Sequence, residues 1–569
     1  MSVTHEDYLR ARFIAEEASK VILPAIRPNN RGRKTLDPVI FLTGGILAVD
    51  IFNVITVTKI YRVLKHELTL EDKIDLGVLK LTKGGVEREI RKNDLYQFTK
   101  RFTKMLDFSS VRVPHLSRTT RHKRRDWIDQ ITQALINPTL IPRPEGSCDF
   151  ALDGTGIWAS ERAPYSISEA DLPEIEHEEE GVVPQEDKRK AIEVSPNLSE
   201  RDLEPIKVGK GQHGASDAGY GSKTNKEGKR KKFYGYDVEA LVRVPSISQS
   251  GSDIRSEPNL LEKLVVLPAS TDIVEPCLRM FDRMKEEGRE IHSLLVDRHY
   301  SYKRFDRWRL ELLRRGIEQV ADMHAKDQGY KEWDGALMIS GWAHCPNTPK
   351  RLAVIPTLGP NATEEQKALF AANISERRAY AAKRINPLDA EGKIRFGCPA
   401  LDGTVGCPRR AGTEATAIAN NLPIIEIVST DENLPSICTQ MSVQFRIQTE
   451  KQMIALKMAQ KFYWGSREWM LSYARRTYVE GWFGVLKNSS ATGFHRGSHQ
   501  FTGLPMVSLV FGIAAAATNL RLLVAWNEAT GKGDITHPLL RPKSTHFGFT
   551  ELTEEQARCM KDQAFRKVA

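Results

Sequence analysis

The spacing of hydrophobic residues predicts that the chain begins with a helical region. Apolar side chains recur at helical spacing over residues 8–23 and 39–64, and no long alternating run precedes residue 140. We therefore expect an α-helical domain over residues 1–140.

From residue 147 the pattern changes to an alternation of strands and helices. Residues 147–159 are predicted to form a strand, a Gly turn and a second strand. Further strands are predicted at 233–244, 292–296 and 317–323, and helices at 273–287 and 302–315. This succession predicts an α/β layer around a central sheet over residues 145–325. Residues 160–215 contain many acids, five prolines and little periodicity, so a mobile acidic loop is expected there.

The second half of the chain combines an insertion with further helices. Short apolar stretches between Pro and Gly turns predict a mainly β insertion over residues 326–460. Helical spacing returns at 467–488 and 504–526, within a segment spanning 461–530, and a polar tail covers 531–569. The apolar run 501–520 contains Gly, Pro and Asn, which favours a buried core helix over a membrane span of about 20 apolar residues.

Charge and composition indicate the kind of partner. Lys and Arg number 83 and Asp and Glu 73, which gives a net charge of +10, and nine of the acids lie between Glu169 and Asp187, so the rest of the chain carries +19. A surface this basic predicts a polyanionic partner. The acidic start does not resemble a signal peptide, and seven scattered cysteines make no disulfide framework, so a cytoplasmic protein with no membrane partner is expected.

A basic block near the end of the helical region is a candidate DNA contact. The stretch 96–105 (YQFTKRFTKM) interleaves aromatic and basic residues, and Arg118, Arg121, Lys123, Arg124 and Arg125 follow it closely. Such blocks commonly bind phosphates, although a solvated helix face produces the same pattern.

The segment YARRTYVEGWFGVLK (473–487) places functional groups on one side of a helix. At 100° per residue, Tyr473, Arg476, Glu480 and Lys487 share a stripe about 60° wide and ~21 Å long. The opposite face is apolar, and Trp482 is expected in the core. One carboxylate flanked by cations suits a metal ion beside a phosphodiester, and an amphipathic helix with an Arg476–Glu480 pair is the alternative.

Two aspartates at strand ends are candidate companions of Glu480. Asp153 follows Phe150-Ala151-Leu152, and Asp297 follows the apolar run 292–296. Ligand sites in α/β sheets favour such edges, and an acid beside an apolar strand is costly unless it is paired or bound to metal. Asp149 shares the strand face of Asp153 but lies at the strand's edge, and a capping role is the alternative for both candidates.

These motifs resemble a known family. The spacing Y-(2)-R-(3)-E-(6)-K over 473–487 matches the signature of one group of bacterial insertion-sequence transposases, which are DDE enzymes with an RNase H-like core. ALDGTGIWA around Asp153 and LLVDRHYS around Asp297 resemble the family's first and second aspartate strands. Residues 217–242 and 503–523 also look like family segments, although Asp237 stands where a Lys is more usual. The resemblance covers roughly residues 147–525, with gaps.

The resemblance implies a fold and a reaction. The fold would be α/β, with an RNase H-like core split by a mainly β insertion that accounts for the 183 positions between Asp297 and Glu480, and with a helical N-terminal domain. Asp153, Asp297 and Glu480 would hold two Mg²⁺ ions, for which Mn²⁺ would substitute. The ions would activate water and then a 3′-OH for DNA cleavage and strand transfer, while Tyr473, Arg476 and Lys487 would grip phosphates.

The resemblance also implies the partners of the reaction. They would be the terminal inverted repeats and target DNA, bound by a homodimer at the nucleoid. Two alternatives stay open, namely an inactive domesticated DNA-binding protein and an RNase H-like endonuclease without strand transfer.

Four cysteines in the insertion are candidate zinc ligands. They are Cys345, Cys398, Cys407 and Cys438, with His344 as an alternative to the last, and three of the cysteines precede Pro. The closest pair is C-x8-C, which is a poor match to the tight pairs of structural zinc sites. The spacing leaves two alternatives open, a structural Zn²⁺ and four unligated thiols.

Overall fold

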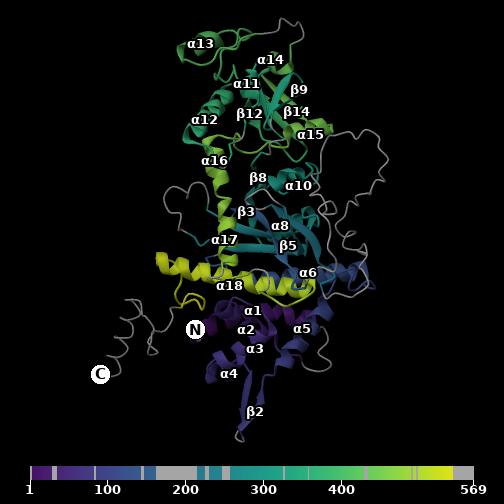
Figure 1. Cartoon of the computed structure of the whole chain (residues 1–569). Coiled ribbons are helices and arrows are strands. Elements are labelled where there is room, and N and C mark those ends of the chain that lie inside the picture. Colours follow the sequence, from purple (N-terminus) through teal and green to yellow (C-terminus); the bar gives the residue numbers. More distant parts are fainter. Residues whose placement is uncertain are drawn as a thin grey trace, which may run out of the picture.

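The structure is a computed structural model that describes residues 3–27, 35–82, 85–142, 147–161, 215–224, 230–245, 257–323, 327, 329–356, 358–359, 361–427, 434–488, 491–494 and 498–541. Three regions follow one another along its long axis (Figure 1): the N-terminal helices, a central sheet, and the insertion at the far end. The predicted acidic loop falls almost wholly on residues 162–214, and most of the predicted tail on 542–569, which lie outside the described residues.

The N-terminal region is mainly helical, as predicted, but it also contains a hairpin. The predicted helix over 39–64 is divided, because Asn53 adopts a left-handed backbone (φ 53°) and Thr56 caps a new helix by accepting from Lys59 N–H. The elements are α1 (His5–Ile26), α2 (Pro38–Phe52), α3 (Val57–Arg62), the π-helix η1 (Val63–Glu67), α4 (Leu70–Asp75), β1 (Leu79–Thr82), β2 (Gly85–Glu89), α5 (Lys92–Leu106), α6 (Arg118–Ile136) and the 3₁₀ turn η2 (Asn137–Thr139).

The central region is a mixed six-stranded sheet with helices packed on it. Its strands are β3 (Ser147–Trp158), β4 (Gly219–Thr224), β5 (Arg230–Val244), β6 (Leu261–Pro268), β7 (Glu290–Val296) and β8 (Glu318–Ala321). Their order is β4-β5-β3-β7-β8, with β6 also paired to β5. The β5 pairings with β3, β4 and β6 are antiparallel, whereas β7 is parallel to both β3 and β8. The α/β class predicted from the sequence is confirmed.

Helices complete the central layer. α8 (Val274–Glu286) packs on β6 and β7. Of the helix predicted over 302–315, α10 (Arg309–Arg314) is the part that forms, and the short α9 (Arg298–Ser301) precedes that range. The predicted helix over 467–488 consists of α16 (Arg467–Ala474) and α17 (Thr477–Lys487), and α17 packs on β3 and β5.

The apolar helix α18 (Leu504–Thr530) joins the central sheet to the N-terminal helices (Figure 1). It contacts α2, α5 and α6 as well as β6 and α17. Its Asn519 side chain bonds the backbone N–H and C=O of Leu261 and the indole N–H of Trp482, so the predicted core position of Trp482 is confirmed. Among the described residues α18 is the helix long and apolar enough to cross a membrane, and 78% of its most apolar window is buried inside the fold.

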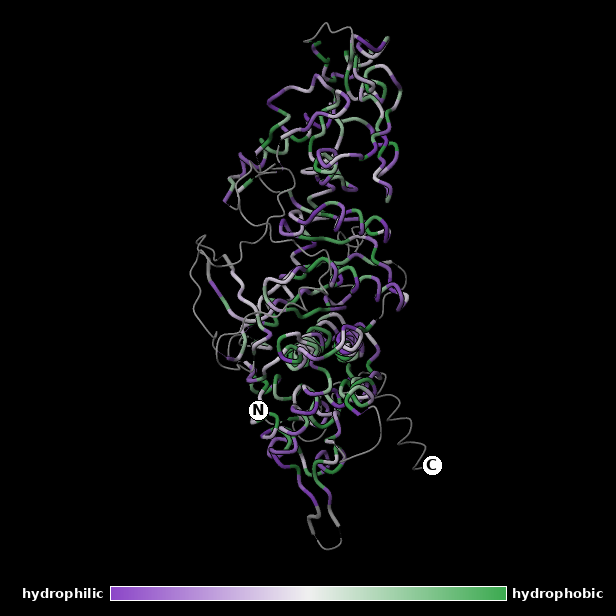
Figure 2. The backbone as a smooth tube through the Cα atoms, turned by 90° about the vertical axis from the view of Figure 1, so that its right-hand side faces the viewer, coloured by the Kyte–Doolittle hydropathy of each residue, from purple (hydrophilic) through white to green (hydrophobic). Residues whose placement is uncertain are grey.

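The hydropathy of the chain follows this arrangement. Hydrophobic residues line the helices seen end-on at mid-height in Figure 2, where α18 meets the N-terminal helices, and the β1–β2 hairpin at the lower tip is hydrophilic. Burial of α18 between two regions therefore links the sheet and the N-terminal domain through one apolar core.

The insertion is mixed rather than mainly β, so that prediction is wrong. Its strands form two antiparallel sheets, β9 (Tyr330–Trp333), β10 (Ala336–Ile339) and β11 (Trp342–His344), and β12 (Lys383–Asn386), β13 (Lys393–Gly397) and β14 (Ser442–Arg446). Its helices are α11 (Lys350–Ala353), α12 (Glu364–Ala379), α13 (Thr413–Ala419), α14 (Ser436–Thr439) and α15 (Glu450–Leu456). A reciprocal cap between Thr363 and Gln366 starts α12 in a segment with good helix formers.

Candidate active site

The pairing of β3 with β7 brings the two candidate aspartates to the same level of the sheet. The strands are parallel, and Leu152 is the register partner of Val296. Asp153 and Asp297 each come one residue later, so they are neighbours at the carboxyl end of β7. Asp297 also accepts from His299 N–H (2.7 Å), which fixes its carboxylate at the start of α9.

Helix α17 brings Glu480 to these aspartates. Arg476 donates to the Glu480 carboxylate (2.6 Å) and lies 3.8 Å from the carboxylate of Asp153. Burial, followed by the negative charges of Asp297 and Glu480, raises the pKa of Asp153 to about 6, and Arg476 opposes the rise. Three carboxylates from β3, the end of β7 and α17 thus act on one another, with one guanidinium between two of them.

The predicted stripe of functional groups is assembled from two helices. Between α16 and α17, Arg475 and Arg476 keep helical backbone angles, but their N–H groups donate three positions back, to Ser472 C=O (3.4 Å) and Tyr473 C=O (2.9 Å). Tyr473, on α16, stacks on the Trp469 ring (centroids 5.0 Å apart), and burial raises its pKa to about 12. The Arg476 guanidinium lies 5.7 Å from the Tyr473 ring centroid, within cation–π range.

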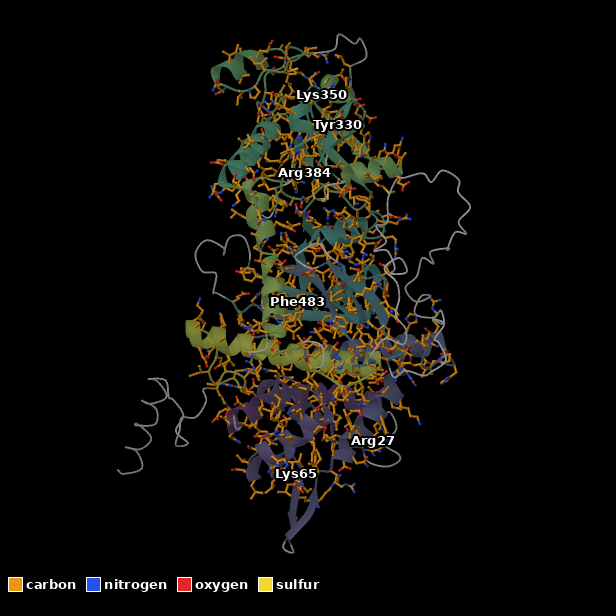
Figure 3. All side chains as sticks on the ribbon, viewed as in Figure 1. Arg27, Lys65, Tyr330, Lys350, Arg384 and Phe483 are labelled. Carbon is orange, nitrogen blue, oxygen red and sulfur yellow. The ribbon has the colours of Figure 1, made fainter. Side chains whose placement is uncertain are left out.

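The far end of α17 also reaches the sheet. Lys487 donates to the Thr155 hydroxyl on β3, two residues beyond Asp153. Phe483 lies on the part of α17 beside the central sheet (Figure 3) and is buried. Arg476 and Lys487 of the predicted stripe therefore both adjoin the strand that carries the first aspartate.

A buried ion pair connects the turn between α16 and α17 to β3. Arg475 bonds the Asp149 carboxylate at 2.5 Å, and their side chains are only 5% and 9% exposed. Arg475 also donates to Pro245 C=O (2.7 Å) and to the Ser472 hydroxyl (3.0 Å). Asp149 is therefore engaged by an arginine that the sequence reasoning did not single out, whereas Asp153 faces Arg476 and Glu480.

Sequence reasoning also missed a fourth acid beneath the site. Glu239 on β5 is buried and accepts a hydrogen bond from Tyr300 Oη. Burial raises the pKa of Glu239 to about 8, and Asp153 contributes to the shift, so this carboxyl is mostly protonated near neutral pH. A Cβ at Gly154 would lie 2.7 Å from the Glu239 carboxyl, so a larger residue after Asp153 would force this carboxyl to move. The sequence signal that could have identified Glu239 is the presence of an acid inside the apolar strand 236–244.

The basic block has a more structural role than the sequence indicated. Arg121 is buried and donates to four backbone carbonyls at residues 108, 113, 114 and 116. Arg125 is buried near Glu275 (3.6 Å), and Arg124 donates to Asp107 C=O (2.6 Å). Lys123 is exposed, so among these four the prediction of DNA contact rests mainly on Lys123.

A basic groove lies beside this block. It has a volume of about 720 Å³ and opens between α5, residues 107–115 and the start of α18. Its lining includes five basic side chains and two aromatic ones: Lys100, Lys104, Arg112, His115, Arg124, Tyr96 and Phe501. Of the interleaved stretch 96–105, Tyr96, Lys100 and Lys104 line this groove, whereas Phe98 and Phe102 are buried in the core.

The cysteines of the insertion lie near one another, whereas the His344 ring is engaged elsewhere and is not a candidate zinc ligand. Cys345, Cys398 and Cys407 belong to one buried cluster, and Cys438 contributes to the raised pKa of Cys345. Both ring nitrogens of His344 are engaged, with Trp342 C=O and Tyr463 Oη, each at 2.8 Å. Across the described residues, no three His, Cys, Asp or Glu side chains are close enough, as placed, to hold a metal ion.

The chain was also compared with models of known protein families, with curated proteins and with solved structures. None of the three comparisons gave a match.

Proposed function

We propose that this chain is a DDE transposase with an RNase H-like core, which cleaves transposon-end DNA and joins it to a target. The observation that carries the proposal is the convergence of Asp153, Asp297 and Glu480, three acids from distant parts of the chain. The mixed sheet supports the proposed core, since the first aspartate lies on the central strand β3 and the second follows the parallel neighbour β7.

The donor set fits Mg²⁺. Carboxylate oxygens are its preferred protein ligands, and the pKa of Asp153 is raised first by burial and then by the negative charge of Asp297, which a cation would neutralise. Asp153, Asp297 and Glu480 would hold two ions, with Mn²⁺ as a substitute, after drawing closer together, because no three acids among the described residues are near enough to enclose an ion. When bound, such ions stabilise the attacking and leaving oxygens of an in-line displacement.

The side chains around the acids would bind the DNA backbone. Arg476 has the planar fork that suits bidentate phosphate contact, and Lys487 supplies a point charge. Arg476 is bonded to Glu480 in the protein alone, so a phosphate that engages Arg476 would release Glu480 toward the metal site. Tyr473, stacked on Trp469 beside Arg476, would position the guanidinium for this exchange.

The proposed partner is double-stranded DNA. The basic groove and exposed Lys123 would hold the terminal repeats away from the cutting site, through contacts that release counterions. We propose a homodimer on DNA, because two transposon ends have to be cut and joined together. Such a protein would act in the bacterial cytoplasm, at the nucleoid.

The test is cleavage of DNA that carries the inverted repeats flanking the gene, in the presence of Mg²⁺. Glu480→Gln and Asp153→Asn should each reduce cleavage to below about one hundredth of the wild-type rate, as expected when an electrostatic group of the site is lost. Glu468→Gln is the matched control, because Glu468 is an exposed acid on the adjacent helix α16.

Each outcome separates one alternative. Cleavage without strand-transfer product would identify an endonuclease, and repeat binding without cleavage by the wild type would identify a DNA-binding protein. Full activity of Glu480→Gln would show that the site is assigned to the wrong residues.

A further inference from the structure

Three of the four cysteines of the insertion lie in one small hydrophobic core, and Cys438 packs against the neighbouring core of the insertion. Cys345, Cys398 and Cys407 are 6%, 8% and 9% exposed, and they form three of the eight buried residues of one hydrophobic cluster among the described residues. The other members are Leu352, Tyr380, Ala400, Val405 and Ile425. Cores of this size commonly need a disulfide or a metal ion to hold their loops together.

Each of the three Cys-Pro pairs begins a hydrogen-bonded turn. Thr348 N–H donates to Cys345 C=O (3.0 Å), Asp402 N–H to Cys398 C=O (3.2 Å), and Arg410 N–H to Cys407 C=O (2.9 Å). In the first turn the backbone N–H of Asn347 also donates a hydrogen bond to the Cys345 thiol. Hydrogen bonds from neighbouring groups orient metal ligands in this way.

Hydrogen bonds connect the four segments that carry the cysteines. The bonds run from Cys345 N to Tyr380 O (3.0 Å), from Thr404 Oγ1 to Ala379 O (2.7 Å) and Pro399 O (3.1 Å), from Cys398 N to Met441 O (3.4 Å), and from Arg410 Nη2 to Gln440 O (2.6 Å). Residues 440 and 441 follow α14, which carries Cys438. The fold thus joins segments up to 93 positions apart into one unit.

We propose that Cys345, Cys398, Cys407 and Cys438 bind one structural Zn²⁺. Four thiolates are a common ligand set for structural zinc, and His344 is engaged elsewhere. Binding releases one proton from each thiol and leaves a net charge of −2, which Arg409 and Arg410 beside the cysteines partly offset. Because no three of these side chains are yet close enough to enclose an ion, the thiols draw together on binding.

Metal analysis of the full-length chain, purified under reducing conditions without chelator, tests the proposal. About one zinc per chain is expected. Cys398→Ser combined with Cys407→Ser should lower the zinc content at least tenfold, whereas Cys148→Ser, at a half-buried cysteine outside the insertion, should leave it unchanged. Less than a tenth of an equivalent in the wild type, or zinc retained by the double variant, would overturn the proposal.

A second measurement uses only the wild type, so it does not depend on a variant that folds. Reaction with a thiol reagent should be counted before and after addition of a strong zinc chelator. We expect four further cysteines to become reactive when zinc is removed, and Co²⁺ in its place should give thiolate-to-cobalt charge-transfer bands. Unchanged thiol reactivity, or disulfides among the four cysteines in the reduced protein, would contradict the proposal whether or not the chain cuts DNA.

Discussion

Replacing Asp153 with Asn should make the metal-free protein more stable at high pH. The pKa of Asp153 is raised from 3.8 to about 6, first by burial and then by Asp297. The folded state therefore binds this proton more tightly than the unfolded chain does. The resulting stability is fully present below pH 3.8 and is lost as the pH rises through 6.

The size of the effect follows from the pKa. The rise from 3.8 to about 6 corresponds to at most ~3 kcal/mol, and the 21% exposure of the side chain lowers this through solvent screening. About half of this maximum stabilisation, at most ~1.5 kcal/mol, is lost between pH 5 and pH 8. The amide that Asp153→Asn introduces does not titrate, so the variant keeps the stability that the wild type loses.

The assay is thermal unfolding in EDTA at pH 5 and at pH 8. We compare the Tm of Asp153→Asn with that of the wild type at each pH. The difference should be about 3–5 °C larger at pH 8 than at pH 5, for a cooperative unit of 150–250 residues. Glu468→Gln is the control, because hydrogen bonds, foremost from its own backbone N–H, lower the pKa of Glu468, so this variant gains nothing at high pH. An equal Tm difference at both pH values would refute the raised pKa of Asp153.

Three further predictions concern the surroundings of the site. Arg475→Ala leaves buried Asp149 without its partner and should cost about 3–5 kcal/mol, measured as a lower unfolding midpoint in urea, and Arg475→Lys should recover part of the loss. Lys487→Gln should weaken binding of repeat DNA and reduce the salt dependence of log K by about one phosphate contact, with the Tm unchanged. Arg121→Ala should lower the Tm because backbone carbonyls lose their donor, whereas Lys123→Ala should weaken DNA binding alone; the reverse pattern would contradict both assignments.

The strands of the two aspartates could be predicted from the sequence. Each aspartate follows a short apolar run, which is a local signal that needs no knowledge of the rest of the chain. Asp297 follows the end of β7, but Asp153 lies within β3, because residues 147–158 form one continuous strand and not the predicted strand, Gly turn and second strand. The contact between Arg476 and Glu480 was also predictable, because residues four apart meet on any helix. The side-by-side register of the strands needs the pairing of β3 with β7, which the sequence pattern does not specify.

The parts that escaped prediction depend on distant contacts or on weak local signals. Helical spacing continues through residues 475–476, and no Gly or Pro interrupts it, so the local sequence does not indicate the change of hydrogen bonding between α16 and α17. This change coincides with the bond from Arg475 to Asp149, 326 positions away. The insertion was assigned to strands from its short apolar stretches. Its 350–358 stretch begins as α11, and 336–344 is two strands joined at Ser340 and Gly341, both with positive φ.

The distance along the chain between Asp297 and Glu480 also has a consequence for protein synthesis. The ribosome adds about 5–20 residues per second, so roughly 10–40 s pass after Asp297 is made before Glu480 exists. During that interval the nascent chain can pair β3 with β7 and set both aspartates in place, but it lacks α17. Any reaction that needs all three carboxylates therefore begins only after the insertion has been made and α17 has docked on β3 and β5. A growing chain beside its own gene would be unable to cut DNA.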